Sequence, residues 1–355
     1  MAKLVFSPRS RSKREVFDLT GNLFTIDDEK TESLVEDVHP SIADFVVRTR
    51  RKQSGRIDVG SSSPISELDR SAIASPDMLT FISFGSGSSG NCAYLGAAEG
   101  GILIDAGVDA DTVRDGLRAH GISRHSIKGV ILTHDHSDHV KYVYSLVRKR
   151  TDLPVFCTPK TLTGLLRRHS ISRRIKDYHR PIYKEFAFKI GPFEITPFEV
   201  SHDGTDNVGY FIACGNQRMA IATDLGCITP RVDYYMRQAN HIMIESNYDA
   251  RMLATGPYPM HLKARIAADA GHLDNAVTGA FLAGIYTENL RNVFLCHLSQ
   301  DNNQPDLALE TVRNALNAAG ITEIGSGDGS LQSRSMKLQL SALPRTEPSQ
   351  MFTLR

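Results

Sequence analysis

Several features that mark common protein classes are missing from this sequence of 355 residues. No segment approaches the roughly 18 consecutive apolar residues that a membrane-spanning helix needs. The first residues, MAKLVFSPRSRSKR, lack the apolar core of a secretory signal peptide. There are five cysteines, an odd number without CxxC spacing, which favours reduced thiols in a cytoplasmic protein. We therefore expect a cytoplasmic protein with no membrane partner, and its oligomeric state is left open.

An excess of charge is also missing from the whole chain, but not from each part of it. The 41 Lys and Arg nearly balance the 40 Asp and Glu, which argues against a nucleic-acid-binding protein. The segment 141–190, however, holds 13 Lys and Arg against three acidic residues. Such clustered cations suit a phosphate backbone, and the interleaved Tyr178 and Tyr183 could stack on bases. The other interpretation is an ordinary solvated helix face.

The composition and the apolar pattern of the sequence change near Met78. Residues 1–77 have few apolar clusters and a Ser-rich stretch, so they predict a flexible or weakly structured extension with short helical pieces near 31–52. An alternative is that Met78 is the true start. Residues 78–355 carry the strand and helix patterns, and we expect them to form the catalytic domain.

Apolar runs and their spacing predict many strands and helices after Met78. Strands are expected at 79–84, 101–105, 129–133, 154–158, 193–200, 208–214, 218–223, 241–246, 292–296 and 336–340. Helices are expected at 109–120, 140–150, 159–168, 229–238, 260–270, 273–287 and 304–318. Strands come first, then interleaved helices, then both again. This order favours two sheets packed face to face with helices outside, a four-layer αββα sandwich.

The most informative segment is THDHSDH at 133–139, which directly follows the apolar strand GVILT. A sharp loop at a strand end can bring together side chains that a regular helix or strand would separate. His134, His136, Asp138 and His139 are therefore candidate metal ligands, and imidazole with carboxylate suits Zn²⁺, Mn²⁺ or Fe²⁺. A polar helix start without a metal is the alternative interpretation.

Three later residues share a local pattern, a liganding side chain just after a predicted strand. His202 follows FEITPFEV, Asp224 follows RMAIAT, and His297 follows NVFLC. Alone, each could be a packed histidine or a turn-forming aspartate. Their recurrence at strand ends indicates that they complete a metal site, with Asp224 able to bridge two cations.

At this point the sequence resembles the metallo-β-lactamase-fold hydrolases, and within them the YycJ/WalJ family. The motifs that carry the resemblance are SFGSGSSGNC (83–92), LIDAG (103–107), THDHSDH (133–139), SHD (201–203), TDLG (223–226), ESNYD (245–249), GPYP (256–259), GHLDN (271–275) and CHLSQDNN (296–303). HxHxDH is shared by the whole superfamily, whereas the other motifs together are narrower. Asp274 stands where the family pattern has Ser. Residues 1–77 fall outside the resemblance.

The resemblance implies a site with two divalent ions, Zn²⁺ or Mn²⁺. One ion would be held by His134, His136 and His202, the other by Asp138, His139 and His297, and Asp224 would bridge. Paired ions of this kind can activate water and stabilise a phosphoryl oxygen. Asp138 and His272 are also expected to take part in catalysis, His272 by protonating the leaving group. Asp135 is expected to orient a ligand or the water.

Substrate contacts are expected from three regions. The Gly/Ser loop at 85–91 exposes groups that could receive phosphate, or it is only a tight loop close to the metals. His272 could instead be a capping residue, and the two asparagines after His297 could brace its loop. The candidate substrate-binding residues are Ser86, Ser88, Ser89, Asn91, Arg167, Arg168, Arg173, Arg174, Asn247, Lys263, Arg265, Asn302 and Asn303.

The sequence thus predicts a metal-dependent phosphodiesterase that acts on nucleic acid, with DNA favoured. The family resemblance implies a 5′→3′ exonuclease on double-stranded DNA with a role in DNA repair. One alternative is a small-molecule hydrolase for thioesters or lactones, which the basic segment disfavours. The other is a non-catalytic nucleic-acid-binding partner, which the complete ligand set disfavours.

Overall fold

The structure is a computed structural model that describes residues 14–17, 23–26, 78–327 and 335–355. The chain divides into two units, Met1–Asp69 and Arg70–Arg355. In the first unit, β1 (Arg14–Phe17) pairs antiparallel with β2 (Leu23–Ile26). The other expectations for residues 1–77, a flexible extension with helical pieces near 31–52, lie outside the described residues.

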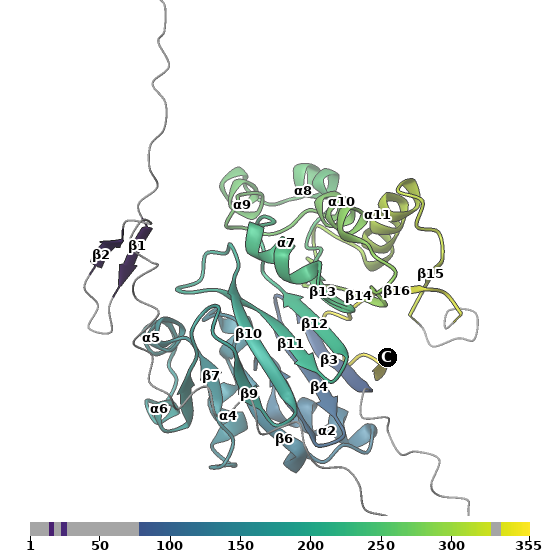
Figure 1. The fold of residues 1–355 in the computed structure, drawn as a ribbon. Coiled ribbons are helices and arrows are strands. Elements are labelled where there is room, and N and C mark those ends of the chain that lie inside the picture. Colours follow the sequence, from purple (N-terminus) through teal and green to yellow (C-terminus); the bar gives the residue numbers. More distant parts are fainter. Residues whose placement is uncertain (1–13, 18–22, 27–77, 328–334) are drawn as a thin grey trace, which may run out of the picture. The chain divides into compact units, whose positions relative to one another are not determined.

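Two mixed sheets dominate the second unit (Figure 1). The first has seven strands in the order β17-β3-β4-β5-β6-β7-β8. Its members are β3 (Leu79–Gly87), β4 (Gly90–Ala97), β5 (Gly100–Ile104), β6 (Ile127–Ile131), β7 (Val155–Cys157), β8 (His179–Pro181) and β17 (Phe352–Leu354). The strands from β5 to β8 are parallel neighbours, so their carboxyl ends lie along one edge of the sheet.

The second sheet has eight strands in the order β15-β16-β14-β13-β12-β11-β10-β9. Its members are β9 (Phe188–Ile190), β10 (Phe193–Glu199), β11 (Val208–Cys214), β12 (Gln217–Ala222), β13 (His241–Glu245), β14 (Asn292–Cys296), β15 (Ile324–Gly325) and β16 (Leu338–Ala342). The strands β12, β13 and β14 are parallel neighbours, and all five residues of β13 and of β14 are buried. Their apolar sequences are typical of strands covered on both faces.

Helices cover the outer face of each sheet. They are α2 (Ala110–Ala119), α3 (Ser137–Val140), α4 (Val143–Val147), α5 (Pro159–Arg168) and α6 (Ile175–Tyr178) in the first half, and α7 (Pro230–Met236), α8 (Ala250–Thr255), α9 (Met260–Ile266), α10 (Asn275–Ile285) and α11 (Pro305–Ala318) in the second. Three hydrophobic clusters fill the spaces: one between the sheets, and one outside each sheet under its helices. This arrangement confirms the predicted αββα sandwich. Among the described residues no helix is long and apolar enough to cross a membrane.

The segment 85–91 is a tight β-hairpin and not an open loop. Gly85 and Ser86 belong to β3, Asn91 belongs to β4, and only Ser88 and Ser89 form the turn. Close packing explains the glycines here: a Cβ on Gly90 would collide with the carbonyl oxygen of Gly107. The glycines are thus required by a tight turn, which leaves the side chains of Ser88 and Ser89 exposed.

Helix boundaries differ from the prediction at two places. The expected helix 140–150 is divided into α3 and α4, because the Tyr142 backbone N–H donates to the Ala106 carbonyl instead of to a carbonyl one turn earlier. The expected helix 260–270 ends at Ile266, and none of its seven residues is buried. The start of α5 agrees with the prediction: Pro159 occupies the first turn and the Thr158 side chain caps it.

Candidate metal centre

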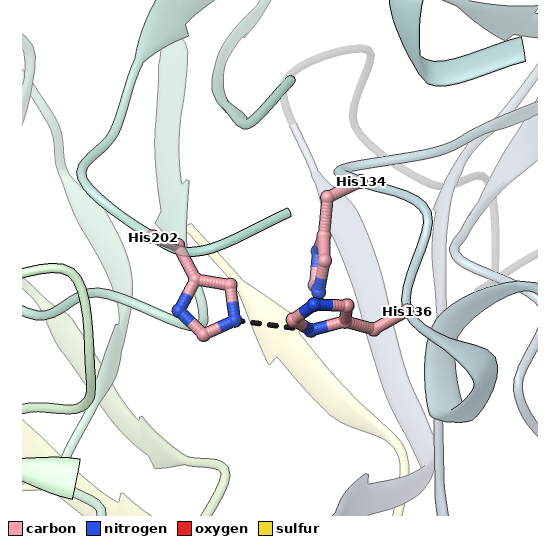
Figure 2. A group of neighbouring side chains, drawn as sticks. All are labelled: His134, His136 and His202. Atoms are coloured by element: carbon pink, nitrogen blue, oxygen red, sulfur yellow. Dashed lines mark hydrogen bonds between the residues drawn. The ribbon is translucent and has the colours of Figure 1, made fainter. Parts of the chain in front are cut away.

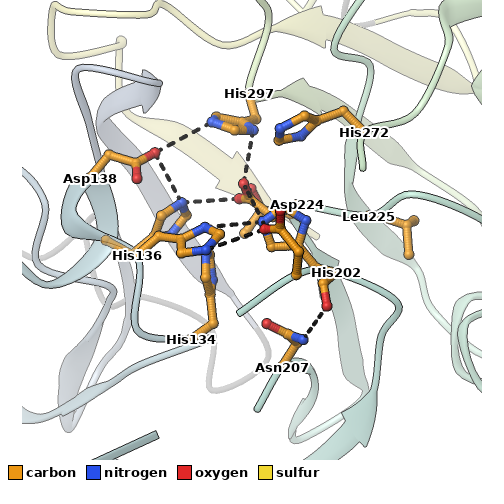
Figure 3. Close-up of polar contacts among 12 residues, drawn as sticks. His134, His136, Asp138, His202, Asn207, Asp224, Leu225, His272 and His297 are labelled. Carbon is orange, nitrogen blue, oxygen red and sulfur yellow. Dashed lines mark hydrogen bonds and ion pairs between the residues drawn. The ribbon is translucent and has the colours of Figure 1, made fainter. Parts of the chain in front are cut away.

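The predicted ligands meet at the strand ends of both sheets (Figure 3). The loop after β6 carries the 134–139 group from the first sheet. His202, Asp224 and His297 follow β10, β12 and β14 of the second sheet. Because parallel strands end at the same edge, side chains far apart in the sequence converge there. The centre therefore joins the two halves of the sandwich.

His134, His136 and His202 form the first cluster (Figure 2). The His202 Nε2 lies 3.2 Å from the His136 Nδ1. The His134 Nε2 is buried and has no hydrogen-bond partner. A buried imidazole nitrogen without a partner is costly unless something binds its lone pair. This orphaned nitrogen, beside two others, fits a divalent cation.

Asp138, His139 and His297 form the second cluster. The Asp138 Oδ2 lies 3.5 Å from the Nε2 atoms of both His139 and His297. The His297 Nε2 is also buried without a hydrogen-bond partner. Two imidazoles and a carboxylate that gather at one position form a ligand set that suits Zn²⁺ and related divalent ions.

Asp224 lies between the two clusters. Its Oδ2 is 3.0 Å from the His139 Nε2, and its Oδ1 is 3.2 Å from the His297 Nδ1 and 3.6 Å from the His202 Nε2. The residue is 2% exposed, so these contacts are shielded from water. The structure thus brings all seven predicted ligands together, with Asp224 between the two clusters.

Most of the clustered imidazoles have their outer nitrogen engaged by the protein. The His139 Nδ1 lies 2.8 Å from the Asp105 Oδ2, and the His297 Nδ1 lies 2.8 Å from the Glu245 Oε1. The Gly271 carbonyl and the Thr133 hydroxyl contact the Nδ1 atoms of His202 and His134. Such partners fix the tautomer that leaves Nε2 free to bind a metal.

Sequence reasoning did not single out Asp105 or Glu245 as site residues. Both are buried acids that follow or end apolar strands, β5 and β13, within the LIDAG and ESNYD motifs. The Glu245 Oε2 also accepts hydrogen bonds from the backbone N–H groups of Leu225 and Leu273. A buried carboxylate at the end of an apolar strand was the available signal, the same one that identified Asp224.

The histidines of the centre differ in the direction in which their surroundings shift their pKa values. Burial lowers the pKa of His134, and its neighbour His139 lowers it further. Burial also acts to lower the pKa of His139, but the adjacent Asp224 and Asp105 outweigh it and raise that pKa well above its usual value. Burial would raise the pKa of Asp138, yet His139 holds it below the usual range. Carboxylates in this centre are therefore ionised, as metal ligands must be.

The predicted catalytic residues occupy different positions. His272 is half-buried, and its Nδ1 lies 2.8 Å from the Glu245 Oε1, beside the rings of His202 and His297. Asp135 is fully buried, and its carboxylate accepts hydrogen bonds from the backbone N–H and the hydroxyl of Thr205. The Asp135 carboxylate thus ties the 134–139 loop to the loop after His202, and it is this loop, not an imidazole ring, that it holds in place.

Four of the predicted substrate-binding residues are buried supports of the centre. The Ser86 hydroxyl accepts from the His297 backbone N–H, and the Asn91 amide donates to the Asp138 carboxylate. Asn302 and Asn303 are buried, and the Asn303 amide donates to the carbonyls of Ser246 and Asn247. These side chains support ligand-bearing loops, which agrees with the bracing interpretation of Asn302 and Asn303 and gives Ser86 and Asn91 the same kind of contact.

Most of the remaining predicted contacts lie nearer to solvent, and Asn247 is the exception. Ser88 and Ser89 form the exposed hairpin turn, and Asn247 is buried with its amide donating to the His297 carbonyl. The Lys263 Nζ donates to the Ala254 carbonyl, whereas Arg265 pairs with Asp203 at 2.7 Å. The basic residues of α5 and the segment after it are exposed: Arg167, Arg168, Arg173 and Arg174.

A cavity of about 190 Å³ opens beside the centre. Its walls include Ser88, His202, Asn247 and His272 on the metal side and Arg265 of α9 on the other. A second, wider hollow of about 520 Å³ lies on the basic segment and is lined partly by Arg167, Lys176 and His179. The centre thus has a small polar cavity beside it, and the basic segment has a hollow of its own.

Comparison with known proteins identifies the family. Residues 101–294 match the model of the β-lactamase superfamily domain. The chain is 33% identical over 248 residues to exodeoxyribonuclease YycJ of Bacillus anthracis, covering 68% of this chain and 90% of that protein. It is 29% identical over 237 residues to exodeoxyribonuclease WalJ of Streptococcus pneumoniae, covering 66% of this chain and 87% of that protein.

Solved structures agree on the fold. The metallo-β-lactamase-fold protein YhfI of Bacillus subtilis superposes with a TM-score of 0.54 at 13% identity, covering 78% of this chain and 100% of that one. Zn²⁺-bound PqqB of Methylobacterium extorquens gives a TM-score of 0.54 at 16% identity, covering 78% and 99%. With the matched ligand motifs and relatives, the fold shows that this chain belongs to the metallo-β-lactamase-fold hydrolases, metal-dependent enzymes, and within them to the YycJ/WalJ family.

Proposed function

We propose that this protein is a dinuclear phosphodiesterase that degrades double-stranded DNA from its 5′ ends, in the cytoplasm and in the service of DNA repair. The observation that carries the proposal is the pair of three-residue clusters with Asp224 between them. Two relatives named exodeoxyribonucleases, matched over nearly their whole length, support DNA as the substrate.

In this proposal His134, His136 and His202 would hold one Zn²⁺ or Mn²⁺ ion, and Asp138, His139 and His297 would hold the other. Asp224 would serve both. Two such ions supply Lewis acidity at a phosphoryl oxygen and activate water, which suits phosphodiester hydrolysis. Asp105, Glu245 and the Gly271 carbonyl hold the imidazoles in the orientation that this needs.

His272 is placed to move a proton to the leaving oxygen. Its Nδ1 donates to Glu245, so its Nε2 carries the transferable proton when the ring is charged. Burial acts to lower the pKa of His272, but the Glu245 carboxylate outweighs it and raises that pKa. An imidazole that lies beside the rings of His202 and His297 and bonds a carboxylate would serve as a general acid when protonated.

The exposed cations of α5 and the segment after it would receive the DNA backbone. Arg167, Arg173 and Lys176 form no ion pair with another described residue, so their charges are available to phosphates. Contacts of this kind give affinity that does not depend on sequence and falls with salt. They lie on the segment that joins the metal loop to β9, on the same half of the sandwich as the 134–139 ligands.

The cavity beside the centre would receive the terminal group of a chain in this proposal. Its volume of about 190 Å³ corresponds to roughly six water molecules at the density of liquid water. A single terminal group fits this space, and a wider hollow of about 700 Å³ also reaches the centre at His202. Ser88 and Asn247 on the walls of the smaller cavity offer polar groups to such an end.

A nuclease panel tests the proposal. Metal-loaded protein would be incubated with single- and double-stranded DNA and RNA labelled at either end, in a series of salt concentrations. We expect duplex DNA to be shortened from its 5′ ends and the His136→Ala protein to be inactive. Hydrolysis of thioesters or lactones with no cleavage of DNA or of bis-p-nitrophenyl phosphate would overturn the proposal.

A further inference from the structure

One imidazole of the centre is supported differently from the others. His134, His139, His202 and His297 each have Nδ1 within hydrogen-bonding distance of an oxygen of the protein. The His136 Nδ1 instead faces the His202 Nε2. Its other nitrogen, Nε2, lies 3.3 Å from the Asp203 Oδ1. His136 is also the more exposed ring, with 23% of its side chain accessible against 2% for His202.

The two carboxylate oxygens of Asp203 face different partners, the imidazoles of the centre and Arg265. The Oδ1 is buried and has no hydrogen-bond partner, and it faces the rings of His136 and His202 at 3.3 and 3.6 Å. The Oδ2 accepts from Arg265, whose Nε lies 2.8 Å away and whose Nη2 lies 2.7 Å away. One oxygen is thus fixed by a guanidinium while the other is left for the imidazole.

Arg265 belongs to α9, a helix that docks with few contacts besides this ion pair. None of the residues of α9 is buried, and Met260 at its start is 77% exposed. The Lys263 Nζ donates to the Ala254 carbonyl of α8, and the Ile266 carbonyl accepts from the His272 backbone N–H. An element without buried apolar contacts has low local stability, so a single ion pair can change how firmly it docks.

We propose that Asp203 is the positioning residue of His136, and that Arg265 couples the docking of α9 to the retention of the metal that His136 would hold. With Arg265 in place, the Asp203 carboxylate is fixed at the Nε2 edge of the ring, which keeps Nδ1 turned toward His202. Without it, His136 lacks the support that the other four rings have. The inference rests on the metal centre proposed above, but not on its substrate.

Metal affinity without DNA provides the test. Ions would be counted by elemental analysis and titrated against a chromophoric chelator. Loss of such a supporting partner typically weakens metal binding about 10- to 100-fold. We expect this loss for one ion in Asp203→Ala, a smaller loss in Arg265→Gln, and near-normal affinity in Arg265→Lys, which keeps the ion pair. The variant that combines Asp203→Ala with Arg265→Gln should bind metal no more weakly than Asp203→Ala alone, because both changes remove the same interaction.

Hydrogen exchange supplies the second measurement. Metal loading should slow exchange in residues 256–270 of the unmodified protein and of the Arg251→Gln control, an exposed arginine on α8, but not of Asp203→Ala. Coupling must act in both directions, so protection of α9 by the metal is the counterpart of metal retention by α9. Unchanged affinity for both ions in Asp203→Ala, or equal protection of α9 in that variant, would overturn the inference. Metal binding that behaves as expected in a protein that leaves DNA intact would overturn the proposed function alone.

Discussion

Single residues at this centre adopt a backbone conformation that is unfavourable outside glycine. Asp105, Asp224 and His297 have φ values of 61°, 52° and 52°, and each lies just beyond the end of a buried strand. Such strain persists only where the surrounding structure fixes it, and it gathers at functional sites. Here it turns three polar side chains from the strand direction into the space between the sheets. Motif spacing predicted that Asp224 and His297 would meet, but not the backbone turn that makes it possible.

Asp224 is expected to be the most sensitive single position. Asp224→Asn keeps the shape of the side chain and removes the charge shared between the clusters. We expect loss of at least one bound ion per chain and a fall in kcat of about 100-fold or more, since a metal-assisted step is worth several kcal/mol. Elemental analysis and kinetics on duplex DNA check this. Two tightly bound ions in the variant would show that Asp224 does not bridge.

The choice of leaving group separates the role of His272 from that of the metals. His272→Gln should lower kcat on DNA by about 100-fold or more, since general acid catalysis contributes roughly that much. Hydrolysis of bis-p-nitrophenyl phosphate should fall far less, because p-nitrophenolate leaves without a proton. Metal content should not change. An equal loss on both substrates would mean that His272 acts on the centre and not on the leaving oxygen.

Local sequence signals predicted some elements well and missed others for identifiable reasons. The helix over 109–120 and the start of α5 at Pro159 carry capping residues, Asp109 and Thr158, and they form as expected. The strand β4 was missed, because its glycines suggested a loop whereas backbone pairing with β3 and β5 forms it. Short edge strands such as β8 likewise depend on partners distant in the sequence, which a local pattern does not contain.

The surface of α5 and α6 is the element that should determine the salt dependence of DNA binding. Replacing Arg167, Arg173 and Lys176 together by Gln removes three cations that have no ion pair with another described residue. The plot of log K against log salt should become less steep by about 0.9 for each phosphate that the variant no longer neutralises. Fluorescence anisotropy on a labelled duplex measures this. Arg118→Gln on α2, which is 80% exposed, is the control that should leave the slope unchanged.

At the scale of the molecule, the centre links the two sheets. Four of the seven candidate ligands follow β6 of the first sheet and three follow strands of the second. The sequence order predicted the two packed sheets and the seven side chains at their edge. The sequence order did not predict the supporting roles of Asp105, Glu245 and Asp203. These residues act through contacts that exist only once the sheets are packed.

Metal removal should therefore lower the stability of the whole fold. A ligand that binds only the folded state stabilises it by about 4 kcal/mol at a thousandfold excess over its Kd. Chelation should lower Tm in the unmodified protein, as calorimetry would measure. His136→Ala should show a smaller drop, since it begins with less metal bound. The same Tm with and without chelator would exclude this stabilising linkage.

A buried histidine far from the strand ends of the centre should make stability fall in acid. His241 begins β13, with Nε2 bound to Gln217 and Nδ1 to Asn292, and burial lowers its pKa to about 3. The unfolded chain takes up a proton near pH 6.5 while the folded chain does not. Stability from this group is thus complete above about pH 6.5 and falls by about 1.4 kcal/mol per unit as the pH drops toward 3.

The variant His241→Gln removes that titration. Urea unfolding would be measured at pH values between about 7 and 4. The free energy of unfolding should fall less steeply in the variant, by about 1.4 kcal/mol per pH unit, which corresponds to one proton. The difference between the two curves isolates His241 from the carboxylates that titrate in both proteins. Parallel curves would mean that His241 accepts a proton in the folded state.

The central claim is that this metal centre cleaves DNA, and one measurement tests it most directly. Protein stripped of metal and then reloaded with measured amounts of Zn²⁺ or Mn²⁺ would be assayed on a duplex labelled at one 5′ end. We expect no cleavage without metal, full activity near two ions per chain, release of the label as a short product, and no activity in the reloaded Asp224→Asn protein. Cleavage that persists without metal, or no cleavage of any DNA with two ions bound, would contradict it.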